Sequence, residues 1–263
     1  MLKYRCCKIN GSCNWKRGIV MAKGEVANAD YLFCEKNGVY YTLIAVSGFW
    51  GAFTYLLRGN TFCNAQTANV VLMGLAVGAA NWKQARYYLI PISAYMLGAF
   101  VSELCPNPVK HRLRIRWESM LLAIEMAFIV GLGFLPESAP VQISQVAINF
   151  IASMQYNTFR QAQGTPMATT FVTNHIRQVG IGLARELRHM NREDKSHRLA
   201  WRKHVCMLLS FFGGVVAGTV LCDLWSGKAI WATLLPLAIL EGLFLKEDRS
   251  LGKENLERKP HGH

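Results

Sequence analysis

The sequence predicts an all-α membrane protein: a bundle of about six transmembrane helices, two short polar helices that re-enter or break, and an internal 3+3 inverted repeat. Three observations lead to this prediction. First, 52% of the 263 residues are hydrophobic and only 17% are charged. Second, the apolar residues come in blocks of about twenty, the length that crosses a bilayer. Third, a polar stretch interrupts the apolar pattern twice, at residues 59–78 and 164–184.

The transmembrane domain is predicted to run from residue 39 to 245, between a basic tail at 1–38 and a charged tail at 246–263. The first tail has no apolar core with a small-residue cleavage site, so we expect the first span to be an uncleaved targeting signal. The six predicted spans are Val39–Leu57, Gln84–Leu104, Trp117–Leu135, Val141–Phe159, His204–Leu224 and Ala229–Leu245.

The distribution of basic residues favours six crossings over eight. With six crossings both termini are cytoplasmic, and the basic residues outside are Arg58, Lys83, Arg86 and Lys228. If both polar stretches also crossed, the basic run Lys110–Arg116 would be exported, against the positive-inside rule. We therefore expect a multi-pass inner-membrane protein with cytoplasmic N- and C-termini.

Four pairs of segments recur in the same order: Phe53–Tyr55 with Asn157–Phe159, Gln66–Gly74 with Val172–Gly180, Gly98–Leu104 with Gly218–Leu224, and Leu122–Glu125 with Leu237–Glu241. They predict two repeats, at about 39–135 and 141–245. Three spans in each repeat place the second copy upside down in the membrane. Inverted repeats with interrupted helices are common in transporters, where the solute site lies at the interruptions.

The polar residues of the two interruptions are the candidate solute site. They are Asn64, Gln66, Thr67 and Asn69 in the first stretch and Thr170, Thr173, Asn174 and His175 in the second. An unsatisfied polar group in hydrocarbon is costly, so these side chains should face protein or a water-filled cavity. We expect them to line a path for a small solute. The other interpretation is that they only form hydrogen bonds between packed helices, as such residues routinely do in membranes.

Two ionisable residues are further candidates. Glu125 lies near the middle of a predicted span, and Arg177 lies in the second polar stretch, two residues after His175. An ionisable group at membrane depth suggests a functional site, here a proton relay or an ion pair between the two residues. A structural pair or a neutral carboxyl is the alternative.

Other activities find little support in the sequence. The eight cysteines have no zinc-like spacing, and no nucleophile and base set is visible, so we expect no metal site, no cofactor and no enzymatic activity. Basic residues beside membrane spans account for the net charge of +13 without nucleic acid. The expected partners are the lipid bilayer and an unidentified small solute, and a homo-oligomer is compatible with the sequence. The alternative function is a non-transporting assembly factor or sensor whose polar stretches only pack helices.

Two motifs resemble those of a known family. GAFTYLLRGNTFCNAQTANVVLMGLAVG (Gly51–Gly78) and MQYNTFRQAQGTPMATTFVTNHIRQVG (Met154–Gly180) are similar to the YoaK-like family of bacterial integral membrane proteins, whose domain has no known function. The resemblance covers about Val39–Leu245 and implies about six transmembrane helices. Family members usually have Thr-Gly-Asn in each motif, and commonly an Asp at the position of Gly51. This chain departs at all three places, so an ion-binding role of that Asp would not carry over.

Overall fold

The computed structural model describes residues 31–106, 115–188, 196–250 and 260, with no side-chain detail for 196–200 and 250. These residues belong to one compact unit, Tyr31–His263. The first 30 residues, most of the basic run Lys110–Arg116 and most of the charged C-terminal tail lie outside the described residues, so the predictions made for them stay predictions.

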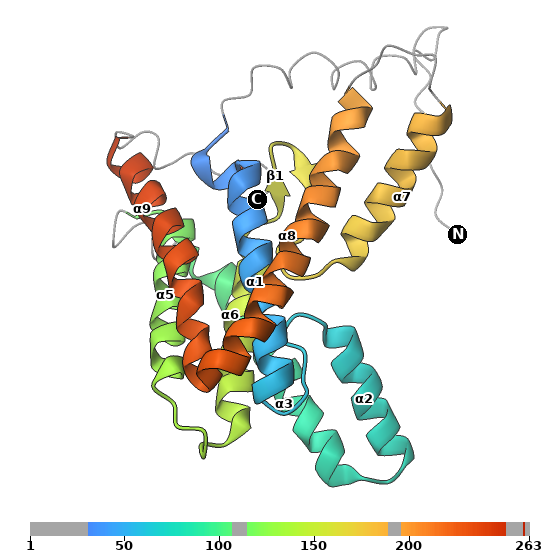
Figure 1. Cartoon of the computed structure of the whole chain (residues 1–263), viewed down its shortest axis with the longest axis vertical. Coiled ribbons are helices and arrows are strands. Elements are labelled where there is room, and N and C mark those ends of the chain that lie inside the picture. The colour runs from blue at the N-terminus through green and yellow to red at the C-terminus, as the bar shows by residue number, and fades with distance from the viewer. Residues whose placement is uncertain (1–30, 107–114, 189–195, 251–259, 261–263) are drawn as a thin grey trace, which may run out of the picture. The chain divides into compact units, whose positions relative to one another are not determined.

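The described chain is helical apart from its loops and one small hairpin, which confirms the all-α prediction (Figure 1). Within it, three stretches are long and apolar enough to cross a membrane: Asn37–Leu57, Trp82–Leu104 and Trp201–Arg249. Such helices fit a membrane protein. In chain order the elements are η2 (Phe33–Glu35), α1 (Asn37–Leu57), α2 (Gln66–Gly78), α3 (Trp82–Leu104), α5 (Trp117–Gly133), α6 (Val141–Thr158), β1 (Gln161–Ala162), β2 (Thr165–Pro166), α7 (Thr173–Arg188), α8 (Ser196–Trp225), η3 (Ser226–Thr233) and α9 (Leu234–Ser250).

Two helix boundaries differ from the prediction. Helix α8 begins at Ser196, eight residues before the predicted span at His204, because no Gly or Pro interrupts the polar run that precedes the span. The last predicted span, from Ala229, begins in the 3-10 helix η3, and α9 starts only at Leu234. Pro236 has no backbone N–H, which is tolerated in the first turn of α9 but not in a helix interior.

The helices pack in matching pairs. Helix α1 lies along α8, and α3 lies along α6, while α2 packs on α3, α7 on α8 and α5 on α9 (Figure 1). Glycines allow the two long pairs to approach closely. A Cβ on Gly214 of α8 would collide with the backbone oxygen of Ala45 on α1, and a Cβ on Gly98 of α3 with that of Phe150 on α6.

Helix α1 is the most enclosed of the three membrane-length stretches, with 72% of its apolar window buried against 22% for each of the others. The side chains of Leu43, Ile44, Trp50 and Phe53 are fully buried. The core of the unit is therefore built around α1.

A short hairpin fixes the N-terminal end of α1. Strand β1 pairs antiparallel with β2, and the backbone N–H of Gln163 in the turn donates to Glu35 O at 2.9 Å. Tyr40 Oη donates to Gln161 O at 2.6 Å. Gln163 and Gly164 both have positive φ, 46° and 72°, as a two-residue hairpin turn requires. The sequence analysis missed this hairpin because each strand has only two residues.

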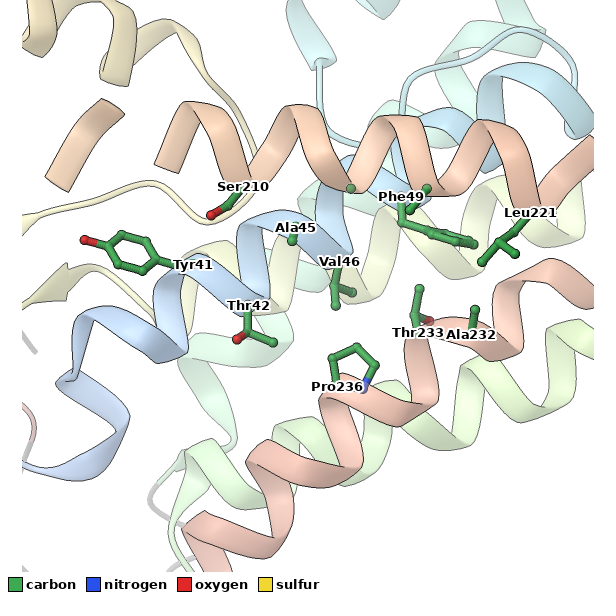
Figure 2. Close-up of a pocket in the computed structure, with 12 residues that line it drawn as sticks. Tyr41, Thr42, Ala45, Val46, Phe49, Ser210, Leu221, Ala232, Thr233 and Pro236 are labelled. Carbon is green, nitrogen blue, oxygen red and sulfur yellow. The ribbon is translucent and has the colours of Figure 1, made fainter. Parts of the chain in front are cut away.

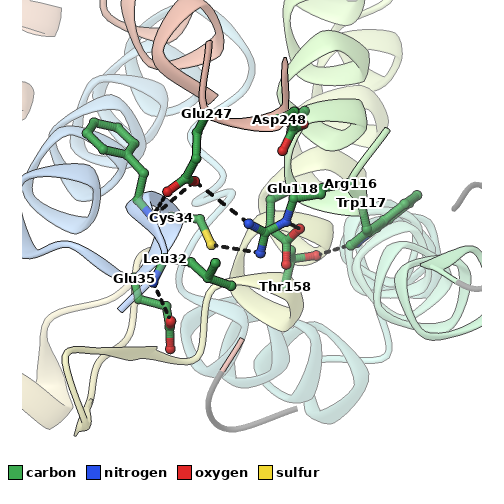
Figure 3. Close-up of polar contacts among 11 residues, drawn as sticks. Leu32, Cys34, Glu35, Arg116, Trp117, Glu118, Thr158, Glu247 and Asp248 are labelled. Carbon is green, nitrogen blue, oxygen red and sulfur yellow. Dashed lines mark hydrogen bonds and ion pairs between the residues drawn. The ribbon is translucent and has the colours of Figure 1, made fainter. Parts of the chain in front are cut away.

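A buried charge cluster joins η2, α5 and α9 (Figure 3). Arg116, 5% exposed, precedes α5; its Nε lies 3.7 Å from Glu118 Oε2 and its Nη1 3.7 Å from Glu247 Oε2 on α9. Glu247 also accepts the backbone N–H of Phe33 at 2.8 Å. Burial, and then the nearby Glu118, raise the pKa of the Cys34 thiol well above its usual range. The thiol at 3.7 Å from Arg116 Nη2 is therefore neutral at pH 7.

Candidate functional site

The loops that precede α2 and α7 meet where α1 crosses α6. Asn64, from the first loop, donates through Nδ2 to the backbone oxygen of Ser47 on α1 at 3.2 Å. Gln155 of α6 donates through Nε2 to Ser47 Oγ at 3.0 Å and to the backbone oxygen of Thr169, in the second loop, at 3.4 Å. We call Ser47, Asn64, Gln155, Thr169 and its neighbour Thr170 the polar junction. All five are buried.

Two polar atoms of the junction have no partner within the described part of the chain, Oε1 of Gln155 and the hydroxyl oxygen of Thr169. The hydroxyl of Thr170 has the phenol of Tyr95 on α3 as a hydrogen-bonding neighbour. A buried polar atom without a hydrogen bond costs about 1–3 kcal/mol. A hydroxyl can donate and accept, and a carboxamide oxygen accepts, so the junction keeps hydrogen-bonding capacity that the described residues do not use.

The junction contains no charged side chain. Gly51 borders it, since a Cβ at this position would meet Asn64 Nδ2 at 3.1 Å. This is the position at which the resembled family commonly has Asp. A carboxylate there would enter the junction, so the glycine leaves the junction of this chain neutral.

A second set of hydrogen bonds connects α2 to α6. Gln66 donates through Nε2 to Asn149 Oδ1 at 2.6 Å, and Asn149 donates to the backbone oxygen of Gln145 at 2.7 Å. Asn69 donates to Gln66 Oε1 at 3.1 Å. These bonds anchor the first turn of α2 to the neighbouring helix.

Asn69 and His175, which the repeat alignment places opposite each other, make the same bond in the two halves. Asn69 Nδ2 donates to the backbone oxygen of Phe62 at 2.9 Å, and His175 Nε2 lies 2.8 Å from the backbone oxygen of Ala168. In both cases the acceptor is seven residues earlier. Each side chain therefore holds the loop against the short helix that follows it.

The structure places Thr67, Thr173 and Asn174 away from the junction. Both threonines are exposed, and the half-buried Asn174 accepts a hydrogen bond from Arg177 at 3.1 Å. Two residues along a helix correspond to about 200° of rotation, so a helix that buries Asn69 turns Thr67 outward, and α7 does the same with His175 and Thr173. The two threonines therefore lie on exposed faces of α2 and α7, and a role for them in lining a solute path stays a prediction.

Glu125 and Arg177 do not form the expected ion pair. Arg177 is exposed on α7. Glu125 is completely buried in α5, and neither carboxyl oxygen has a hydrogen-bond partner in the described chain.

Replacing Glu125 with glutamine should therefore change the free energy of unfolding by no more than about 1 kcal/mol, an ordinary value for one substitution. An ionised carboxylate without a partner is very costly to bury, so the neutral amide of similar size should be accommodated. Chemical unfolding of the purified protein in detergent would measure the change. A loss of several kcal/mol would show that Glu125 holds a cationic partner.

An apolar pocket of about 440 Å³ lies between α1, α8, η3 and α9 (Figure 2). Thr42, Val46 and Pro236 point into it, and its few polar groups come from Tyr41, Thr42, Ser210 and Thr233. The pocket shares no residue with the polar junction or with the residues singled out in the sequence.

Sequence reasoning missed the helix residues that complete the polar sites: Ser47, Asn149, Gln155 and His204. Ser47 and Asn149 are single polar residues within apolar segments, whereas Gln155 and His204 lie in polar stretches at the ends of theirs. For Ser47 and Asn149 the signal was available, because an isolated polar side chain in a membrane helix is expected to face other protein.

Comparison with known protein families gives one match. The family described as "Protein of unknown function (DUF1275)" matches residues 39–243, nearly the whole extent of the resemblance seen in the motifs. No curated protein and no solved structure matches the chain. Since the match covers well over half of the sequence, the chain belongs to the DUF1275 family.

Proposed function

We propose that the chain is an inner-membrane protein that moves or conducts a small, uncharged polar solute past the polar junction. The observation that supports this best is the pair of buried, unpartnered oxygens on Gln155 and Thr169. They lie where two non-helical loops meet, and such loops are tolerated at membrane depth where they line a cavity or pack within protein. A neutral junction favours a neutral solute.

The proposal includes six membrane crossings, by α1, α3, α5, α6, α8 and α9, with both termini in the cytoplasm. The shortest of these helices have 17 residues, about 26 Å at 1.5 Å per residue. This is close to the hydrocarbon thickness of about 30 Å.

An inverted 3+3 repeat is part of the same proposal, and the helix pairing supports it. In this repeat the first half consists of α1, α2, α3 and α5, and the second half of α6, α7, α8 and α9, matched in that order. The contact of α1 with α8 then has the contact of α6 with α3 as its counterpart, and both are observed. The aligned glycines agree: a Cβ on Gly98 would meet Ser153 at 3.0 Å, and one on Gly218 would meet Phe49 at 3.1 Å. Transporters built in this way bind solute between their halves.

The test compares Thr169→Val with Thr173→Val. Thermal stability of the purified protein would be measured against a panel of amides, polyols, sugars, amino acids and inorganic anions. A solute at 100 times its dissociation constant stabilises the native state by about 2.7 kcal/mol. We expect a neutral solute to stabilise the wild type and Thr173→Val, but not Thr169→Val.

Thr169→Val should itself fold, because it removes a buried hydroxyl without a partner at nearly constant volume. Equal stabilisation of both variants would exclude the junction as the site. No response from the folded wild type across the panel would contradict solute binding.

The alternative is a non-transporting assembly factor or sensor whose polar residues only pack helices. The bonds of Asn69 and His175 to their own loops support this reading. It predicts that Asn69→Ala lowers stability by about 1 kcal/mol, the worth of a hydrogen bond, and that no solute affects either threonine variant.

A further inference from the structure

Two histidines form a buried pair between α7 and α8. His175 Nδ1 lies 2.8 Å from His204 Nδ1, and the two rings are 0% and 4% exposed. The other nitrogen of His175 lies 2.8 Å from the backbone oxygen of Ala168.

These contacts assign the protons. A carbonyl oxygen only accepts, so His175 Nε2 must carry a proton. In a neutral ring Nδ1 is then bare and accepts, which means that His204 Nδ1 carries the proton that lies between the rings. His204 Nε2 remains free to take up one more proton.

The pair can gain one proton without losing a hydrogen bond, but not two. The first proton goes to His204 Nε2 and leaves the contact between the rings intact. A second would have to bind His175 Nδ1, which would set two N–H groups and two cations against each other at the present 2.8 Å. Taking up the second proton therefore requires α7 to separate from α8 at this point.

The surroundings do not offset an added positive charge. Lys203 on α8 repels a charge on His204, and Arg177, two residues after His175 on α7, is exposed and donates a hydrogen bond to Asn174. Residues 163–172 contain no charged side chain. On α1, Tyr41 interacts with Cys206, two residues after His204. Burial lowers the pKa of His175.

The pair is directly connected to the polar junction along the chain. Ala168, whose carbonyl His175 holds, is followed by Thr169 and Thr170. Movement of His175 would release the loop that brings these two threonines to Gln155.

We infer that the His175–His204 pair is a proton-binding site that controls the loop of residues 163–172, and through it the polar junction. This inference rests on the proposed function for its role in solute movement, because it names the proton as the ion that regulates that site. The first half has no such site, since Asn69 makes the corresponding bond with an amide.

The bond that Asn69 makes in the first half suggests a variant that separates the effect of protonation from the effect of the hydrogen bonds. In His175→Asn the amide can donate to Ala168 O, and its oxygen can accept from His204 Nδ1. Both hydrogen bonds are kept, while the second titratable ring is lost.

The experiment is hydrogen exchange of residues 163–172 in the full-length protein in detergent, measured from pH 8 to pH 5 and corrected for the intrinsic rate. Unfolded histidines titrate near 6.5. A native pair that resists protonation binds fewer protons than the unfolded chain, so its stability falls as pH falls below that value. We expect exchange in this loop to become about tenfold faster at pH 5 in the wild type, the effect of 1.4 kcal/mol. His263→Gln should behave like the wild type, and His175→Asn should show a clearly smaller acid step, because only the buried His204 remains to be protonated.

Wild-type exchange that does not change with pH would overturn the inference, and so would an acid step of undiminished size in His175→Asn. Because no solute is present, these outcomes are independent of solute binding. A His175-dependent acid step in a protein that binds no solute at pH 8 would support the proton site and contradict the proposed function.

Discussion

Replacing Arg116 with methionine is expected to lower the free energy of unfolding by about 3 kcal/mol. The substitution keeps the volume of the side chain but removes the cation between Glu118 and Glu247, whose carboxylates lie in a mostly enclosed cluster. Breaking a buried pair leaves charge without compensation, which costs much more than the pair itself contributes. Equilibrium unfolding in detergent at pH 7 would measure the loss.

Arg160→Met is the matched control. Arg160 Nη2 lies only 2.8 Å from Glu103 Oε2, but these side chains are 38% and 68% exposed. Exposed pairs contribute little because water and salt screen them, so a loss of about 1 kcal/mol or less is expected. Equal losses in the two variants would show that burial of the Arg116 cluster does not determine its contribution.

Replacing Gly214 with leucine is expected to prevent stable packing of α1 on α8, with a loss of about 3 kcal/mol or more. Any Cβ at this position meets the backbone of Ala45, and backbone cannot move aside as a flexible side chain can. Thermal unfolding followed by tryptophan fluorescence would report the loss, because Trp50 is buried in α1.

Gly213→Ala provides the control on the adjacent residue. No atom lies within 4 Å of a Cβ built at Gly213. Because alanine is the better helix former by up to about 1 kcal/mol, this variant should be as stable as the wild type or more stable. If Gly214→Ala were equally stable, the close approach of the two helices would be contradicted.

The sequence predicts the long helices well because their signal is local. A block of about twenty apolar residues needs no knowledge of its neighbours, so the expected and observed bounds of α1, α3, α5 and α6 agree within two residues. The 3-10 helix η3 and the hairpin are different, since each depends on contacts with distant parts of the chain.

The candidate site could be predicted only in part. The polar stretches identify Asn64, Asn69, Thr170 and His175, all of which are buried. Composition alone does not show which residues of a short helix face the interior. Thr67 was therefore predicted to belong to the solute site together with Gln66 and Asn69. The partners Gln155 and His204 come from other helices, and only the packing of α6 and α8 reveals them.

The hairpin at Gln161–Pro166 also sets an order of events during synthesis. Tyr40, at the start of α1, cannot form its hydrogen bond until Gln161 has been synthesised, and Gln161 is 121 residues later in the chain. At about 5–20 residues per second, this interval is on the order of ten seconds. The contacts of α1 with α8 form later still. The newly synthesised first half is therefore present for this time without α8, the main packing partner of α1. Helix α1 reaches its final packing only after most of the chain has left the ribosome.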